Sequence, residues 1–430
     1  MNAVAVSAAR PRPFGRGGLW AHTDFLRLFA AQTVSLFGSE ITVIALPLTA
    51  VLTLGATPAQ MGLLAAASKL PYVIVGLFAG VWVDRLRCRS VLVSADFGRA
   101  VLLGSVPLAA VLGVLRMEHL FAVAFLAGIL TVFFDVAYQS YLPELVNRDR
   151  LIDGNGKLEA SKSLAETAGP IIGSVLLQIA AAPFAIGIDA LSFVLSGLFL
   201  RSIRTSTVPR PTCSRAGVLS EVRVGVLLVL RHSILRPIAV CSASMNLFYQ
   251  MLAAVYIIYV TTQLHLSPAA IGLIFGIGSL AGLGGAVVAS PAAERLGIGM
   301  TLILSIVVSS VGALAILLVH SSDLFAVATL TAAQLVLTFG IPLYNINQLS
   351  MRQAITPPGL RGRVNATNRC LVWGTMPIGS LIGGLLAQAI GMQPTIALAG
   401  AGMLLTCLWL VISPVRSLTA RKAAALADLA

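Results

Sequence analysis

Residues 57–63 read Thr-Pro-Ala-Gln-Met-Gly-Leu, and residues 267–273 repeat this pattern as Ser-Pro-Ala-Ala-Ile-Gly-Leu. The same offset of 210 residues relates Asp84-Arg85-Leu86 to Glu294-Arg295-Leu296. It also pairs Asn155 with Asn365, Gly169 with Gly379, Gly173 with Gly383 and Gln178 with Gln388. Because one offset holds over so long a stretch, we interpret the chain as two parallel copies of one structural unit.

The composition of the chain points to a lipid environment. Only 10% of the residues are charged and 57% are hydrophobic, whereas a soluble domain carries roughly 25% charged residues. Lipid solvates apolar side chains directly and penalises a charge at a helix centre by about 2.5 to 3.5 kcal/mol, which excludes an ordinary soluble enzyme. The net charge of +13 does not indicate nucleic acid as a partner, because the basic residues form short clusters between apolar runs.

Twelve runs are long and apolar enough to form transmembrane helices, since a helix that crosses ~30 Å of hydrocarbon needs about 20 mostly apolar residues. The predicted spans of the first half are 25–53, 62–83, 90–115, 119–142, 160–180 and 183–201. Those of the second half are 234–262, 270–290, 299–319, 323–349, 367–390 and 395–413. We expect an all-α membrane protein of twelve transmembrane helices in two six-helix parallel repeats, an arrangement of transporters whose halves rock around a central site.

The basic residues predict the orientation of these spans. The N-terminal stretch, the even-numbered loops and the C-terminus hold 24 of the 29 Lys and Arg residues, and the opposite loops hold only Arg116. Since basic loops stay in the cytoplasm, we expect both termini there, with the chain in a bacterial cytoplasmic membrane. The expected parts are a cytoplasmic tail (1–24), an N-terminal six-helix bundle (25–201), a cytoplasmic linker (202–233), a C-terminal six-helix bundle (234–413) and a second cytoplasmic tail (414–430).

The loop between the second and third predicted spans holds a charged motif. It reads Gly80-Val-Trp-Val-Asp84-Arg85-Leu-Arg87-Cys-Arg89, which resembles the G-x-x-x-D-R-x-G-R-[KR] signature of the major facilitator superfamily, with Arg87 where a glycine is usual. Glycine lets a neighbouring helix approach closely, and the charged groups can form contacts that break when the halves rock. We assign conformational gating to Gly80, Asp84, Arg85 and Arg89. A plain basic cytoplasmic loop is the alternative.

The fifth predicted span holds a second motif of this superfamily. From Gly156 to Ser174 the sequence follows G-x8-A-x3-G-P-x2-G-S, which is similar to the antiporter signature G-x8-G-x3-GP-x2-GG, with alanine and serine in place of two glycines. Small residues at this spacing make a flat helix face for tight packing, and proline bends the helix. The resemblance implies an exporter, and we assign gating roles to Gly169, Pro170 and Gly173.

Glu40 lies near the middle of the first predicted span. An unpaired carboxylate is costly there, so it must be protonated, paired or turned toward a water-filled cavity. A carboxyl group that exchanges a proton as a cavity opens to each side supplies the coupling that an antiporter needs, and it can also hold a cationic substrate. The alternative is a structural Glu40 paired with Lys69 or with an interhelical amide. Asp135 in the fourth span is a second proton-relay candidate, with helix pairing as its alternative.

Other charges within the spans have a simpler interpretation. Asp96 and Arg99 lie three residues apart, and Lys162 and Glu166 lie four apart, so each pair shares one helix face. We interpret both as neutralised structural pairs near the cytoplasmic edge. Asp189 in the sixth span faces either the cavity or only its outer mouth.

The second half has almost no charge within its predicted spans, so its candidate cavity residues are amides and phenols. Such groups suit bulky, partly apolar compounds. Each of them can instead form a hydrogen bond between helices. The predicted substrate-cavity residues of both halves are Phe37, Asn246, Tyr249, Tyr256, Tyr344, Asn345 and Gln348.

The sequence contains no P-loop, catalytic triad or cluster of His and Cys with metal-binding spacing. We therefore expect no enzyme activity, no cofactor and no metal. The energy for transport then comes from an ion gradient or from the gradient of the substrate itself. The expected partners are a small-molecule substrate, protons and the lipid bilayer, and a monomer is sufficient for this architecture.

Three short stretches also resemble the bacterial branch of the superfamily that contains enterobactin exporters and macrolide efflux pumps. They are Ser35–Glu40, Asp96–Arg99 and Arg361–Val364. With the antiporter motif, this resemblance implies a proton/solute antiporter that exports a drug, siderophore or secondary metabolite. A proton-coupled uptake symporter and a transport-inactive membrane scaffold or sensor are the alternatives, because fold alone does not determine function.

Overall fold

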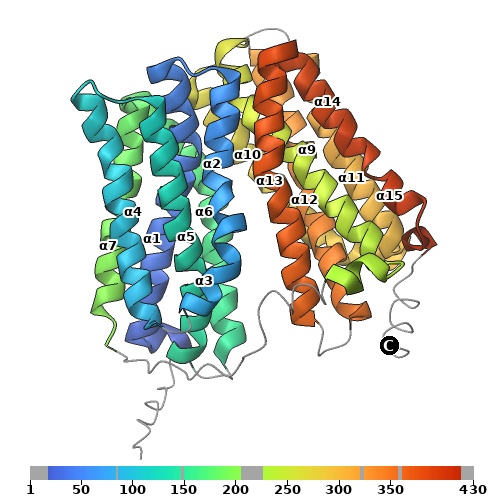
Figure 1. The fold of residues 1–430 in the computed structure, drawn as a ribbon, viewed down its shortest axis with the longest axis horizontal. Coiled ribbons are helices and arrows are strands. Elements are labelled where there is room, and N and C mark those ends of the chain that lie inside the picture. Colours follow the sequence, from blue (N-terminus) through green and yellow to red (C-terminus); the bar gives the residue numbers. More distant parts are fainter. Residues whose placement is uncertain are drawn as a thin grey trace, which may run out of the picture.

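The computed structural model describes residues 18–83, 86–146, 150–204, 226–319, 324–356 and 361–417. These residues form helices and contain no strand. In Figure 1 the helices of the first half of the sequence stand beside those of the second half, and most of them run along the same direction. The predicted all-α fold is confirmed for this part of the chain.

The first half of the sequence folds into one group of helices. The α1 helix ends in a π-helical turn, η2, and the α2 and α3 helices are separated by Val75. The bounds are α1 (Thr23–Leu48), η2 (Thr49–Thr53), α2 (Pro58–Ile74), α3 (Gly76–Val83), α4 (Cys88–Val111), α5 (Met117–Leu145), α6 (Leu151–Ile179) and α7 (Ala182–Ser202).

The second half forms the other group. Gly297 and Gly391 have positive φ angles of 83° and 95°, a conformation that glycine adopts without strain, and they separate α10 from α11 and α13 from α14. The bounds are α9 (Leu235–Thr262), α10 (Pro268–Leu296), α11 (Ile298–Ala315), α12 (Leu324–Ile355), α13 (Arg361–Ile390), α14 (Met392–Leu405) and α15 (Leu408–Val411).

Ten helical segments of the described chain are long and apolar enough to cross a membrane. Two of the twelve predicted spans are outside this set. The span predicted at 62–83 falls on α2, which is only 17 residues long, and on the short α3 that follows the break at Val75. The span predicted at 160–180 falls on α6, which carries several charged side chains. These are Asp153, Lys157, Glu159, Lys162 and Glu166.

The repeated sequence 57–63 and 267–273 makes the same local structure twice. Thr57 caps α2 by accepting a hydrogen bond from the backbone N–H of Gln60, and Ser267 caps α10 by accepting one from Ala270. In both cases a proline follows the cap at the first helical position, where its missing N–H has no partner to lose. The sequence repeat is therefore a repeat of helix starts.

The repeat also extends to the contacts between the two halves. The α2 helix packs on α13, and α6 packs on α10. A Cβ atom on Gly62 would lie 2.6 Å from the carbonyl oxygen of Ser380, and one on Gly272 would lie 2.8 Å from the carbonyl oxygen of Pro170. Since Gly272 and Ser380 are each 210 residues beyond Gly62 and Pro170, the two crossings are equivalent under the sequence offset.

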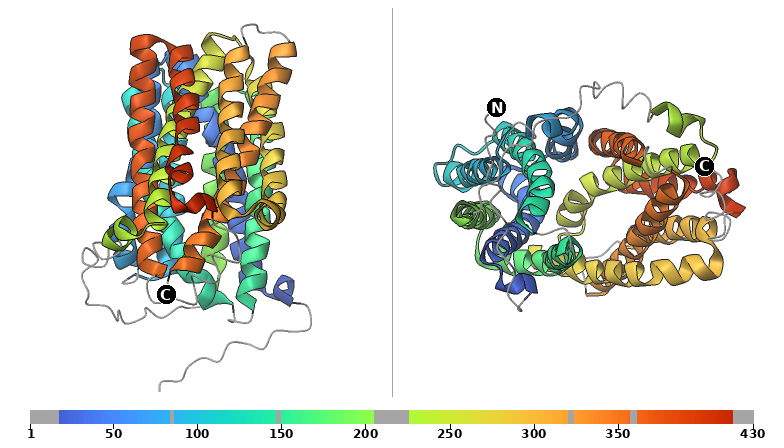
Figure 2. Two further views of the ribbon diagram at one scale, coloured as in Figure 1. Left: turned by 90° about the vertical axis from the view of Figure 1, so that its right-hand side faces the viewer. Right: turned by 90° about the horizontal axis from the view of Figure 1, so that it is seen from below.

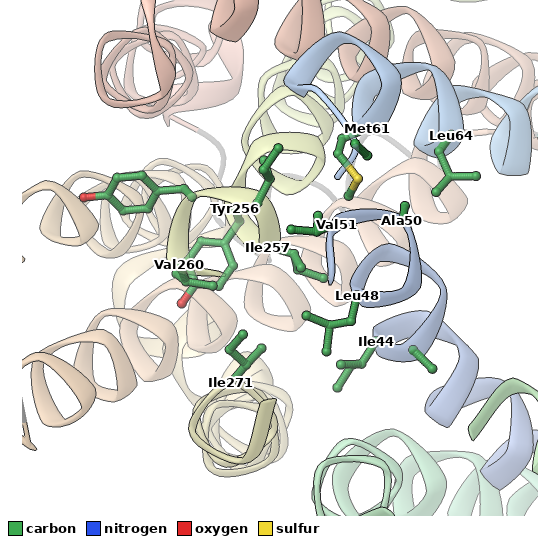
Figure 3. Close-up of a cluster of buried hydrophobic side chains, with 14 of the residues drawn as sticks. Ile44, Leu48, Ala50, Val51, Met61, Leu64, Tyr256, Ile257, Val260 and Ile271 are labelled. Atoms are coloured by element: carbon green, nitrogen blue, oxygen red, sulfur yellow. The ribbon is translucent and has the colours of Figure 1, made fainter. Parts of the chain in front are cut away.

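A cluster of buried apolar side chains joins the halves near these crossings. Figure 3 shows Ile44, Leu48 and Val51 from α1 and η2 together with Ile257 from α9 and Ile271 from α10. In Figure 1 the halves are closest at the top, where α2 and α10 begin, and Figure 2 shows the two groups from the side and from below. The apolar cluster and the glycine crossings therefore seal one end of the boundary between the halves.

Candidate substrate cavity

A cavity of about 510 Å³ lies between the two halves, and we call it the main cavity. Its wall contains residues of α1, α2, α4, α5 and α7 from the first half, and of α9, α10 and α12 from the second. Most of the wall is apolar or aromatic, which suits a partly apolar ligand. The polar lining residues are Ser39, Thr42, Ser68, Lys69, Tyr72, Arg99, Thr131, Asp189, Tyr249, Gln250, Tyr256 and Gln334.

Asp189 supplies the buried carboxylate of the main cavity. Its side chain is held by the hydroxyl of Thr42 from α1 and by the hydroxyl of Ser192 at 3.0 Å, and the residue is only 1% exposed. Gly38 makes room for this arrangement, because a Cβ atom there would overlap with Asp189 and Ser192. Of the two positions left open by the sequence, the cavity wall is the one observed.

Arg99 lies in the same wall and is held on all sides. It forms the predicted ion pair with Asp96, whose other carboxylate oxygen accepts a hydrogen bond from Ser196 at 2.6 Å. The guanidinium lies between the rings of Phe134 and Phe193, at 4.4 and 4.1 Å from their centroids. The ion pair is confirmed. However, Arg99 lines the main cavity, whereas the sequence predicts that this pair lies near the cytoplasmic edge.

Lys69 lines the main cavity and takes part in no ion pair among the described residues. It places a basic group in a wall that also holds the Asp189 carboxyl group. The structural ion pair between Lys69 and Glu40, which was the alternative for Glu40, is not formed here. Opposite charges in one cavity allow it to bind substrates with a cationic or an anionic group.

Glu40 is half-buried beside the main cavity and is not one of its lining residues. Its neighbours Ser39 and Thr42 do line the cavity. The Glu40 side chain packs on Gly169 of α6, where a Cβ atom would overlap with it. The second predicted charge pair is on the same helix, with Lys162 3.7 Å from Glu166, and it is confirmed.

Two of the predicted substrate-cavity residues of the second half, Tyr249 and Tyr256 of α9, line the main cavity. The Tyr256 ring packs edge-on against Phe275 at 5.5 Å, and its buried hydroxyl has no hydrogen-bond partner among the described residues. Tyr256 therefore contributes to the wall while its hydroxyl stays buried. Asn246 lies one turn before Tyr249 and continues this helix face beyond the lining residues.

The other predicted cavity residues are not part of the wall. Phe37 is half-buried on α1, and Asn345 is exposed on α12. The Tyr344 hydroxyl bonds to Ser242 at 2.8 Å, and Gln348 accepts a hydrogen bond from Arg352 at 3.3 Å, so both serve helix packing. The wall residues of α12 are Gln334 and Leu337, about 15 and 10 Å along the helix from Tyr344 at 1.5 Å per residue. The main cavity therefore meets α12 nearer to the start of the helix than the predicted residues.

The predicted gating residues of α6 lie at helix crossings. Gly169 and Gly173 face Glu40 and Ile41 of α1, while the Pro170 carbonyl faces Gly272 of α10. The α6 helix is thus held between the two halves by its small residues.

In the charged motif, Arg89 donates hydrogen bonds to the carbonyl oxygens of Leu200, at 3.2 Å, and Arg201 at the end of α7. Gly80 is in α3, and Asp84 and Arg85 lie outside the described residues. The contact of Arg89 is therefore within the first half.

Asp135 lies in a second cavity of about 210 Å³, which we call the side cavity. The Tyr72 hydroxyl, which reaches both cavities, donates a long hydrogen bond of 3.4 Å to the Asp135 carboxylate. Across the boundary between the halves, the Trp373 ring of α13 contacts Tyr72 edge-on at 5.1 Å. The structure thus separates the two predicted carboxylates, Glu40 beside the main cavity and Asp135 in the side cavity.

The sequence pattern that defines the Major Facilitator Superfamily matches residues 28–374 and again residues 238–428. The chain belongs to the major facilitator superfamily. It is therefore a multi-pass membrane transporter and not an enzyme.

Its relatives within the superfamily include efflux proteins. The chain is 27% identical over 391 residues to the multidrug efflux pump Tap of Mycolicibacterium fortuitum, covering 88% of this chain and 93% of that protein. It is 23% identical over 404 residues to macrolide efflux protein A of Streptococcus pyogenes, covering 90% of this chain and 94% of that protein. The predicted resemblance to the efflux branch is confirmed.

A bacterial homologue of the iron transporter ferroportin has the same fold. Its inward-facing structure superposes with a TM-score of 0.73 at 19% identity, over 92% of this chain and 98% of that chain. Its outward-facing structure gives a TM-score of 0.57 at 20% identity, over 90% and 98%. Both structures therefore share the fold of this chain.

Proposed function

We propose that this chain is a proton-coupled antiporter that exports a drug, siderophore or secondary metabolite by alternating access. The observation that carries the proposal is the main cavity between the halves, whose largely apolar wall holds one buried carboxylate and one basic group. Such a cavity suits bulky, partly apolar compounds with a charged group. The named activities of Tap and macrolide efflux protein A support export over uptake.

The proposed membrane arrangement has twelve spans with both termini in the cytoplasm. In it, α2 and α3 together form one span, and α6 forms another in spite of its charges, because Lys162 pairs with Glu159 and Glu166 on its own helix. The domains are the tail (1–24), the bundles (25–201 and 234–413), the linker (202–233) and the second tail (414–430). One chain contains the whole cavity, so a monomer is sufficient.

In this orientation α2 and α10 begin on the outer side of the membrane. The glycine crossings and the apolar cluster then close the outer end, and the main cavity is accessible from the cytoplasm. Export requires the crossings to separate while the cytoplasmic ends close, with Gly80, Asp84, Arg85, Arg89, Gly169, Pro170 and Gly173 as the gating residues.

Glu40 is the proposed proton carrier, and Asp135 is the second candidate. Glu40 sits where α1 meets α6, so a movement of α6 changes its surroundings directly. Among the described residues it has no ion-pair partner that would hold it charged. Asp189 is added to these candidates as the carboxylate in the cavity wall, where it can attract a cationic substrate.

The test uses inverted membrane vesicles with an inside-acid pH gradient. Proton efflux is recorded while lipophilic cations, macrolides and siderophores are added to the wild type, Glu40→Gln and Asp135→Asn. Glu118→Gln is the matched control, because Glu118 is an exposed carboxylate at the start of α5 that lines neither cavity. We expect a substrate-dependent proton signal that is lost in Glu40→Gln and kept in the control.

The other outcomes separate the alternatives. A signal that survives in Glu40→Gln and disappears in Asp135→Asn moves the coupling role to Asp135. Substrate-driven proton movement in the opposite direction would support uptake by symport. Folded protein that gives no signal with any compound would contradict the antiporter proposal and favour a transport-inactive scaffold or sensor.

A further inference from the structure

The side cavity holds two opposite charges that do not meet. Asp135 of α5 and Arg369 of α13 both line it, yet neither takes part in an ion pair among the described residues. The Asp135 carboxylate accepts the long hydrogen bond from the Tyr72 hydroxyl. Arg369 is exposed and Asp135 is half-buried, and their charged groups lie farther apart than the distance of an ion pair, so a ligand with two opposite charges can contact both.

The wall between these charges is aromatic and rigid. The Arg369 guanidinium lies 4.2 Å from the centroid of the Trp373 ring, and Trp373 in turn packs edge-on against Tyr72. These contacts fix Arg369 at the α13 side of the cavity, while Tyr72 fixes Asp135 at the opposite side. The remaining wall includes apolar side chains such as Val73, Val132 and Val136.

We propose that the side cavity binds a small zwitterion, with its ammonium group on Asp135 and its phosphate or carboxylate on Arg369. A guanidinium and a carboxylate recognise these two groups through charge-assisted hydrogen bonds. The volume of about 210 Å³ is well below the 510 Å³ of the main cavity, so the ligand is smaller than a compound that fills the main cavity. Because α5 and α13 belong to different halves, the ligand contacts both.

Two sources offer this chemistry, a free zwitterionic solute and the headgroup of an aminophospholipid. The soluble probe is phosphoethanolamine. The lipid probe is a nanodisc made of equal parts of phosphatidylethanolamine and phosphatidylcholine, compared with a nanodisc of phosphatidylcholine alone. Both lipids have the same net charge, but only the ethanolamine headgroup has N–H donors for Asp135.

Cys370 reports occupancy because it lines the side cavity and is half-buried. The purified full-length protein is pulsed with N-ethylmaleimide, and the modified fraction of each cysteine peptide is measured by mass spectrometry. Cys407 is the internal control, since it is also half-buried and lies outside both cavities. The change in thermal unfolding temperature on adding each probe is a second readout that does not depend on thiol reactivity.

One supporting result is that phosphoethanolamine, added to protein in phosphatidylcholine nanodiscs, slows the labelling of Cys370 and leaves the labelling of Cys407 unchanged. The source of the ligand is then a free solute. Slower labelling only in the phosphatidylethanolamine nanodisc supports the proposal with a lipid headgroup as the source. We expect Asp135→Asn and Arg369→Gln each to weaken the effect about tenfold, since each removes one charged partner. Arg369→Lys keeps the charge and should retain part of it.

The proposal is overturned if neither probe changes Cys370 labelling or the unfolding temperature. It is also overturned if Cys407 is protected equally, or if the effect persists in both folded charge-removal variants. Arg295→Gln removes an exposed charge in the last turn of α10, which does not line the side cavity, and should leave the protection unchanged. None of these readouts measures transport, so the result is independent of the proposed antiport.

Discussion

At the scale of single residues, the main cavity combines charges that are neutralised with charges that are free. Arg99 forms an ion pair with Asp96, and two aromatic rings cover its guanidinium. Groups of the protein itself therefore compensate its charge. Lys69 has no such partner, and Asp189 is held by hydroxyl groups alone. A substrate therefore meets Lys69 and Asp189 as the effective charges of the wall.

This difference predicts opposite effects of two substitutions on substrate choice. Asp189→Asn keeps the size of the side chain but removes its charge, so export of cationic compounds should fall about tenfold or more, the effect of losing a hydrogen bond to a charged group. Lys69→Gln should leave cation export equal or higher and reduce the export of anionic compounds. The measurement is uptake of matched cationic and anionic fluorescent compounds into inverted vesicles. Equal losses for both classes in both variants would show that these charges do not select the substrate.

The Arg99 cluster predicts a loss of stability. Arg99→Ala leaves Asp96, which is fully buried, without its partner, and breaking a buried ion pair costs about 3–5 kcal/mol. The matched control is Asp153→Ala, which breaks the partly exposed pair with Lys157 and should cost ~0–1 kcal/mol. Thermal unfolding in detergent compares them. A similar unfolding temperature for both variants would contradict the assigned role of Arg99.

At the scale of helices, the repeat in the sequence reappears as a repeat of contacts. Thr57 and Ser267 cap α2 and α10 in the same way, and Gly62 and Gly272 lie one turn into these helices at equivalent crossings with α13 and α6. The equivalent partners differ in residue type, with Ser380 and Gly384 at one crossing and Pro170 and Ser174 at the other. Small residues at both places allow the backbones to approach closely.

We expect leucine at either crossing to push the helices apart. Gly62→Leu and Gly272→Leu overpack backbone contacts, which costs about 1–3 kcal/mol and should expose the outer end at least about fivefold more often. The measurement is the rate at which a membrane-impermeant maleimide, added from outside, labels a Gln250→Cys residue in the main cavity. Gly374→Leu is the control, because nothing lies within 4 Å of a Cβ atom at Gly374. An effect at one crossing alone would contradict their equivalence.

The sequence predicted the helices better than the cavity, for a physical reason. Hydropathy and caps are local, so the starts of α2 and α10 could be inferred from Thr57 and Ser267. The position of a cavity along a helix depends on how helices tilt and cross, which no local pattern contains. Tyr249 and Tyr256 line the main cavity, whereas Tyr344, which was assigned to the same wall, bonds to Ser242.

At the scale of the whole molecule, two stretches decide how many times the chain crosses the membrane. The α2 and α3 helices are interrupted at Val75, and α6 is rich in charge, so neither qualifies as a span by length and composition. Both nevertheless pack lengthwise between other helices, α2 on α5 and α13, and α6 on α1 and α10. A helix with such neighbours can cross without meeting the full cost of lipid contact, because they shield its polar groups.

Single cysteines at the ends of these stretches test the count of twelve. Thr53 and Arg87 flank α2 with α3, while Arg150 and Ala181 flank α6, and each has an exposed or half-buried side chain. If both stretches span, a membrane-impermeant maleimide should label Thr53→Cys and Ala181→Cys in right-side-out vesicles, and Arg87→Cys and Arg150→Cys only in inverted vesicles. Gln263→Cys, between α9 and α10, is the control for the outer side. If both ends of one stretch are labelled from the same side, that stretch does not cross the membrane. The number of crossings is then odd, which places the two termini on opposite sides and contradicts the prediction that both are cytoplasmic.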